Sequence, residues 1–90
     1  MGTAFALNGA TPHPARGRMR LSISLPDAEP AMIALYDLAG RRAWAKDVGA
    51  LGPGRHVIEV AGSGTLPAGV YLARLSRPGQ MLERRVVLMR

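Results

Sequence analysis

Residues 18–25 read Arg-Met-Arg-Leu-Ser-Ile-Ser-Leu, and this stretch decides the fold class. Its apolar side chains, Met19, Leu21, Ile23 and Leu25, occupy every second position, with arginine or serine between them. Alternation with a period of two puts successive side chains on opposite faces of an extended chain, so one face of this segment is apolar and the other polar. The pattern predicts a β-strand that covers one side of a packed core.

The rest of the chain repeats this arrangement between reversals rich in glycine, proline and aspartate. Further strands are expected at residues 5–8, 31–36, 41–48, 56–60, 70–75 and 81–90. Turn signals recur every ~8–12 residues, which is typical of a β-sandwich, and few segments are long enough for a helix without a glycine or proline. We therefore predict an all-β, Ig-like or fibronectin-III-like sandwich of about seven antiparallel strands.

Length and composition limit the chain to one small domain. The sequence has 90 residues, no cysteine and a net charge of +6 from 12 basic and 6 acidic side chains. We expect residues 1–10 to form an N-terminal segment, either a weak first strand or the remnant of a linker, and residues 11–90 to form the domain. A chain of this size buries only about 60–65% of its unfolded surface, so stability rests on the apolar strand faces.

No pattern in the sequence points to catalysis or to a bound metal. His13 and His56 lie in different segments without a nearby second ligand, whereas zinc sites need about three or four converging ligands. Gly62-Ser63-Gly64 comes nearest to a nucleophile turn, but no helical pattern follows it. The sequence predicts that the domain is not an enzyme and has no cofactor.

Four basic residues gather near the end of the chain, at Arg74, Arg77, Arg84 and Arg85, in two strands that should pair as a hairpin. They either form a basic docking surface or are simply solvated on an outer face, where arginines also discourage edge-to-edge association. No nucleic acid is expected, because aromatic side chains for base stacking are not interleaved with them. No transmembrane segment is expected either, since no stretch approaches the ~18–20 apolar residues that a span needs.

Several short motifs occur in an order that resembles a known family. They are Pro12-His13-Pro14-Ala15-Arg16-Gly17, Leu21 to Pro26, Leu35 to Arg41, Gly54-Arg55-His56 and Leu66 to Tyr71. Together they resemble the C-terminal sorting domain of type IX secretion cargo (type A) and the similar Ig-like domain of the flagellar hook-capping protein. The resemblance covers residues 11–90. Carried over position by position, it implies a recognition motif at Pro12, Pro14, Gly17, Gly69, Tyr71 and Arg90.

The resemblance also implies a function. Such a module would target an attached exported protein through the outer-membrane type IX translocon to the cell surface or the medium, after transit through the periplasm. Its partners would be that translocon, a surface sortase and a fused upstream cargo domain, and the basic docking surface would face an anionic translocon component or lipopolysaccharide. The domain is expected to be a monomer, although an exposed edge strand near Phe5 could support weak pairing.

Three alternatives stay open at this point. Gly69 and Tyr71 could form a tyrosine corner, in which the phenol bonds back to a loop carbonyl, rather than a recognition site. The domain could be a generic Ig-like spacer or protein-interaction domain. It could also be an ancillary glycan-binding or polyanion-binding module, for which Trp44 is the best aromatic candidate.

Overall fold

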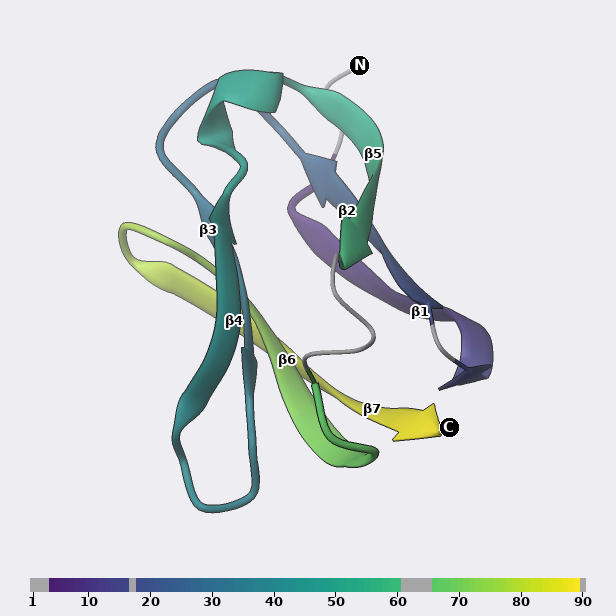
Figure 1. The fold of residues 1–90 in the computed structure, drawn as a ribbon. Helices are drawn as coiled ribbons and strands as arrows, with labels where there is room; N and C mark the ends of the chain where they lie inside the picture. Colours follow the sequence, from purple (N-terminus) through teal and green to yellow (C-terminus); the bar gives the residue numbers. More distant parts are fainter. Residues whose placement is uncertain (1–3, 17, 61–65, 90) are drawn as a thin grey trace.

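The computed structural model describes residues 4–16, 18–60 and 66–89. This part of the chain is almost entirely extended, and its strands form an elongated body (Figure 1). In chain order the elements are β1 (Ala6–Arg16), β2 (Arg18–Leu25), β3 (Met32–Tyr36), β4 (Arg42–Asp47), the short 3₁₀ helix η1 (Gly49–Leu51), β5 (Gly54–Val60), β6 (Gly69–Arg77) and β7 (Gln80–Met89).

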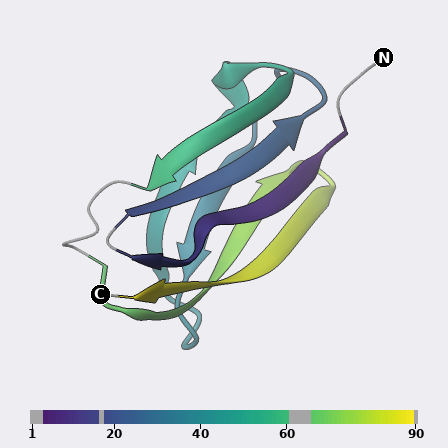
Figure 2. The same ribbon diagram turned by 90° about the vertical axis from the view of Figure 1, so that its right-hand side faces the viewer.

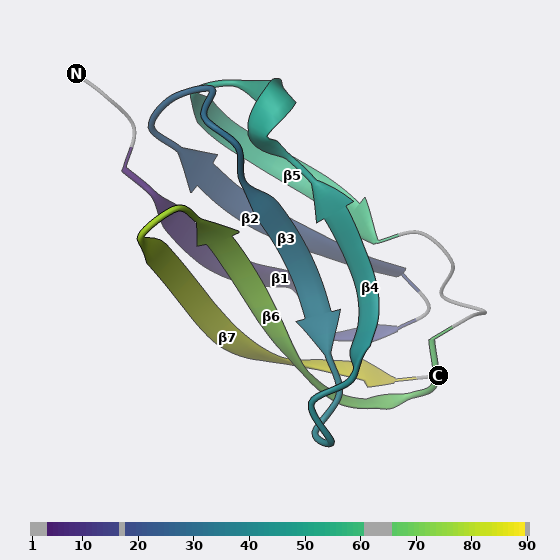
Figure 3. The ribbon, with the colours of Figure 1, turned by 90° about the vertical axis from the view of Figure 1, so that its left-hand side faces the viewer.

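The strands form two layers that pack face to face (Figures 2 and 3). One layer has the order β4-β3-β6-β7 and the other β1-β2-β5, with antiparallel neighbours throughout each layer. A short parallel pairing of β1 with β7 joins the layers along one side. The fourth strand pairs with the third, unlike the immunoglobulin constant arrangement, in which it joins the first, second and fifth strands. The prediction of a seven-stranded all-β sandwich is confirmed.

The core lies between the two layers and follows the alternation in the sequence. Every inward side chain of β2, from Met19 to Leu25, is at most 2% exposed. Opposite them pack Ile33 and Leu35 of β3 and Leu75 of β6, all with no exposed surface, in one continuous cluster. Burial of apolar side chains at alternate positions on both layers is therefore what stabilises the fold.

The first strand is longer than expected. Its pairing with β2 shifts between Leu7 and Gly9 and again between Thr11 and Arg16. Pro12 and Pro14 lie within the second interruption, and proline has no backbone N–H to donate to a ladder. Beyond it, β1 ends beside β7, so the prolines fall where this strand passes from one layer to the edge of the other.

Among the described strands, β4 and β5 stand at the two ends of the strand order. The expectation of an exposed edge strand near Phe5 stays a prediction. β1 begins one residue later, its first residues pair with β2, and its pairing with β7 is confined to Ala15 and Arg16.

A close approach of two loops holds the connection from β4 to β5. The backbone N–H groups of Val48 and Gly49 donate hydrogen bonds to the carbonyl of Ala31, at 2.9 and 3.2 Å. Gly49 is buried there, and a Cβ on it would lie 2.6 Å from the carbonyl oxygen of Glu29. The chain can cross between layers at this point only because residue 49 has no side chain.

Candidate functional site

Gly69 and Tyr71 begin β6 and form a tyrosine corner. Tyr71 is 4% exposed, packs in the core cluster, and its hydroxyl donates a hydrogen bond to the carbonyl of Pro67. This bond ties the start of the strand to the loop four residues upstream, as in other Ig-like sandwiches. This is the geometry of the tyrosine-corner alternative. Gly69 is exposed beside it.

The strand register brings distant parts of the predicted recognition motif to one end of the sandwich. Leu88 of β7 is paired with Gly69 on one side and with Ala15 on the other. Pro12 and Pro14 precede Ala15 in β1, and the ends of β1 and β7 lie side by side beside the start of β6 (Figure 2). Backbone segments separated by more than fifty positions in the sequence therefore lie together at one end of the sandwich, which we call the terminal end.

Two residues of the motif, Gly17 and Arg90, lie outside the described residues. Their described neighbours Arg16 and Met89 form the last pair of the parallel contact between β1 and β7. The side chains of Pro12 and Pro14 are also outside the described set, so only their place in the backbone of β1 is defined.

The structure does not bring the four predicted arginines onto one face. Arg85 is paired with the outward Leu72, whereas Arg84 is paired with the buried Ala73, so the two neighbours point to opposite sides of the sheet. Arg74 alternates with Leu72 along β6 and therefore shares the outer face with Arg85. Successive side chains of a strand point to opposite faces, so Arg84 and Arg85 cannot belong to one stripe.

Arg74 is engaged by neighbours on the outer face. Its Nε and a terminal nitrogen approach Glu83 Oε2, at 2.9 and 2.8 Å, and its guanidinium lies 4.4 Å from the centre of the Tyr36 ring. The hydrogen bond that Arg74 donates to the Glu83 carboxylate raises the pKa of Arg74. Arg85, which is exposed, is the less constrained of the two arginines on this face.

Arg77 links two loops at the opposite end from the tyrosine corner. Its side chain is 13% exposed, and one terminal nitrogen lies 3.1 Å from Asp27 Oδ2 and 2.9 Å from Glu29 Oε2. Both carboxylates belong to the turn between β2 and β3, and Phe5 lies under the guanidinium at 5.4 Å. Arg77 therefore acts as a structural clamp. It lies away from the surface that Arg74 and Arg85 share.

This clamp predicts a specific acid sensitivity. The backbone N–H of Glu29, with help from Arg77, lowers the pKa of Asp27 below its ordinary value of 3.8. A carboxylate with a depressed pKa stabilises the folded state above its ordinary pKa and stops doing so as the pH falls through the folded value. The urea midpoint should therefore fall below about pH 4, and Asp27→Asn should flatten that fall.

Asp37 contributes to the same acid transition, because the backbone N–H of Arg41 lowers its pKa as well. The Asp27→Asn profile should accordingly be flatter than that of the native chain but not level. Identical pH profiles for the two proteins, measured by urea unfolding from pH 6 down to about pH 2.5, would show that the Asp27 carboxylate is not held by the clamp.

Arg84 links the two layers along the side where β7 and β1 are neighbours, which we call the seam. Its Nε donates a hydrogen bond of 2.7 Å to the carbonyl of Leu7, where β1 has not yet reached β7. Beside it lies a shallow hollow of about 520 Å³ lined by residues 5–8 and 82–84, and a smaller one of about 220 Å³ that Asn8 and Arg85 also line. The sequence gives no sign that Leu7 is the partner of Arg84, because nothing local signals a contact over 77 positions.

The two neighbouring arginines should therefore differ in their effect on stability. Arg84→Ala is expected to lower the free energy of unfolding by about 0.5–1 kcal/mol through loss of the bond to Leu7. Arg85→Ala should stay within about 0.5 kcal/mol of the native value, as for most exposed positions. Urea unfolding of both variants, followed by Trp44 fluorescence, measures the difference. Equal effects would place Arg84 in solvent instead of across the seam.

Two further candidates, His56 and Trp44, make contacts within the domain, while the His13 side chain and residues 62–64 lie outside the described set. His56 bonds through Nε2 to the carbonyl of Gly52 at 2.8 Å, next to the β4–β5 connection. Trp44 is half-buried and packs against the core from the edge strand β4. Among the residues that the structure describes, no group of three or more His, Cys, Asp or Glu side chains lies close enough to hold a metal ion. The same part of the chain has no helix with the length and hydropathy to cross a membrane.

A scan against models of known protein families finds no match for this chain, and a search of curated proteins finds none either.

Proposed function

We propose that this domain is a non-catalytic Ig-like module that targets an attached exported protein through the outer-membrane type IX translocon to the cell surface or the medium. The observation that carries the proposal is the terminal end, where the Pro12/Pro14 segment, Gly69 and the end of β7 meet through the pairs of Leu88. A translocon that recognised a folded domain would need its contact residues in one region, and the sandwich supplies that region from three strands.

The tyrosine corner assigns different roles to the two members of the Gly-x-Tyr motif. Tyr71 is buried and bonded to Pro67, so its contribution is to hold the corner in shape. Gly69 is exposed and is paired with Leu88, the residue that also pairs with Ala15 in the parallel contact, so we assign it to the surface that a partner would contact. On this proposal Tyr71 positions the site and Gly69 with the proline segment forms it.

The outer face of Arg74 and Arg85 is the proposed place for an anionic partner, either a translocon component or lipopolysaccharide. Arg85 is exposed at this face, while Arg74 is already paired with Glu83. We therefore assign the larger share of any such attraction to Arg85. Because exposed charges are screened beyond about 8 Å at physiological ionic strength, the partner would have to approach closely.

A second candidate function is a protein-interaction domain without a sorting role. It is favoured by three exposed methionines on the outer face of the β3-β6-β7 layer, Met32, Met81 and Met89, which are 39%, 53% and 38% exposed. Methionine is adaptable and is frequent on surfaces that bind partners. The two candidate functions differ in one expectation. A sorting module makes export of an attached protein depend on the translocon, and an interaction domain does not.

A reporter fusion tests the role of the terminal end. Residues 1–90 would be placed after a fluorescent protein with a signal peptide in a bacterium that has a type IX translocon. The paired change Pro12→Ala/Pro14→Ala should reduce the reporter outside the cells. The matched change Pro53→Ala/Pro78→Ala, at two exposed prolines away from the motif, should leave export unchanged.

Both paired variants must first give the native near-ultraviolet signal of Trp44, so that misfolding is not mistaken for lost recognition. Export of the Pro12/Pro14 variant at the native level would remove the proline segment from the recognition site. Loss of export in the Pro53/Pro78 variant would show that transport responds to changes anywhere in the domain, which contradicts a localised site.

A further inference from the structure

The edge strand β5 is unusually regular for a free sheet edge. Its seven residues pair with β2 in one continuous register, from Val60 opposite Met19 to Gly54 opposite Leu25. Figure 2 shows it at the margin of its layer, and β2 is its only neighbour in the sheet order of the described strands. Alternate N–H and C=O groups on the other side of such a strand are available to pair with another strand. The other edge, β4, is less suitable, because its pairing with β3 shifts between Leu35 and Tyr36.

The outward side chains of β5 are arranged symmetrically. Arg55 and Glu59 stand two residues before and two residues after Val57, and all three share the outer face. Val57 is 65% exposed, which is high for a β-branched residue in the middle of a strand. Charged residues usually protect an edge from association. Here their signs are opposite, and they flank the apolar residue at equal distances.

We propose that β5 is a self-association edge at which two copies of this chain pair antiparallel about a two-fold axis through Val57. In this register Arg55 of each copy lies opposite Glu59 of the other, and the two Val57 side chains lie opposite each other. Cross-strand pairs of opposite charge and of β-branched side chains both stabilise antiparallel neighbours. This proposal is independent of the sorting function.

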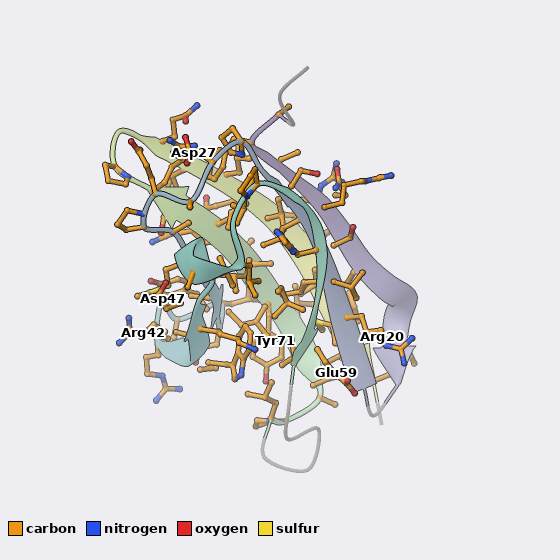
Figure 4. The ribbon with its side chains drawn as sticks, turned by 90° about the horizontal axis from the view of Figure 1, so that it is seen from above. Arg20, Asp27, Arg42, Asp47, Glu59 and Tyr71 are labelled. Carbon is orange, nitrogen blue, oxygen red and sulfur yellow. The ribbon has the colours of Figure 1, made fainter. Side chains whose placement is uncertain are left out.

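The symmetry of the register fits the geometry of the sheet. Arg55, Val57 and Glu59 are alternate residues of β5, so their side chains lie on the same face of the sheet. A two-fold axis perpendicular to the sheet keeps this face of both copies on one side. The β1-β2-β5 layers then form one continuous six-stranded layer, because each copy contributes three strands. Glu59 is paired with Arg20 across the β2–β5 ladder, and Figure 4 shows the two at the same end of the layer.

The dimer should be weak. One pair of edge strands buries less than the ~1,200 Å² below which interfaces are transient. The net charge of +6 on each copy adds repulsion, which salt screens beyond about 8 Å near 0.15 M. Sedimentation equilibrium at that ionic strength should therefore show a monomer of 9.6 kDa when dilute and a rising average mass toward about 1 mM.

Charge exchange tests the register. Arg55→Glu places two acidic residues opposite two others, and Glu59→Arg does the same with basic residues, so each variant alone should dimerise at least about tenfold more weakly. Mixing the two variants should restore a dimer, because each then offers the other opposite charges at both positions. Arg42→Glu, on the edge strand β4, makes the same change in net charge as Arg55→Glu and should leave association unaffected.

The outcomes separate this edge from other modes of contact. A native chain that stays monomeric at about 1 mM overturns the proposal, and so does a mixture of the two variants that associates no better than either alone. Association that Arg42→Glu abolishes and Arg55→Glu spares would assign the contact to β4 instead. Glu59→Arg could fail to fold because Arg20 is adjacent, and hydrogen exchange of the β5 amides then replaces the mixing experiment. Exchange is measured at several protein concentrations in the native chain and in Arg55→Glu. Protection that rises with concentration only in the native chain supports the pairing, and protection that does not change with concentration in either protein refutes it.

Discussion

Tyr71→Ala is expected to lower the free energy of unfolding by about 3–5 kcal/mol, the range for removal of a buried aromatic ring. Tyr71 is 4% exposed and packs in the single core cluster, so its removal leaves a cavity between the layers. A small sandwich has only about 5–15 kcal/mol of total stability, so the variant should be partly unfolded at moderate temperature. Urea unfolding followed by far-ultraviolet circular dichroism measures the loss.

Tyr71→Phe separates the ring from its hydroxyl group. The phenylalanine variant keeps the packing and loses only the hydrogen bond to Pro67, so it should cost about 0.5–1.5 kcal/mol. A loss below about 1 kcal/mol for Tyr71→Ala would take Tyr71 out of the core and revive a direct role in recognition.

Gly49→Ala is expected to destabilise the domain by about 2–3 kcal/mol, which is large for the addition of one methyl group. The new Cβ would lie 2.6 Å from the carbonyl oxygen of Glu29 and 2.8 Å from the Cα of Pro30. Both are backbone atoms, so relief requires the β2–β3 loop to move away from η1. That movement would also weaken the two hydrogen bonds that Ala31 accepts from Val48 and Gly49.

The neighbouring position provides the control for this prediction. Ala50 lies in the same turn of η1 and is exposed, so Ala50→Leu should change stability by less than about 0.5 kcal/mol. Thermal unfolding of both variants gives the comparison. A Gly49→Ala variant as stable as the native chain would mean that the two loops are not in contact.

Local sequence pattern was sufficient to predict most of the architecture. Alternation in residues 18–25 identified the inward face of β2, because side-chain period and burial are the same property in a strand. The tyrosine corner was also predictable, since the hydroxyl of Tyr71 reaches a carbonyl only four residues away. These features depend on neighbours in the chain.

The features that the sequence did not reveal depend on long-range register. The parallel pair of Ala15 with Leu88 joins the first and last strands of the chain, and it determines the terminal end. The clamp of Arg77 on Asp27 and the bond of Arg84 to Leu7 span 50 and 77 positions. The four arginines are close in sequence but have different neighbours. Arg74 contacts Glu83, Arg77 contacts the β2–β3 turn, Arg84 bonds to Leu7, and Arg85 is exposed on the outer face.

The measurement that tests the sorting proposal most directly is the exported fraction of the reporter fusion in two strains, one with a type IX translocon and its partner strain without one. Limited proteolysis of the fused domain would establish in each strain that it is folded. We expect reporter at the surface or in the medium of the first strain only. Reporter held in the periplasm of both strains, with the domain folded, would contradict sorting in that host and leave the protein-interaction function as the better explanation.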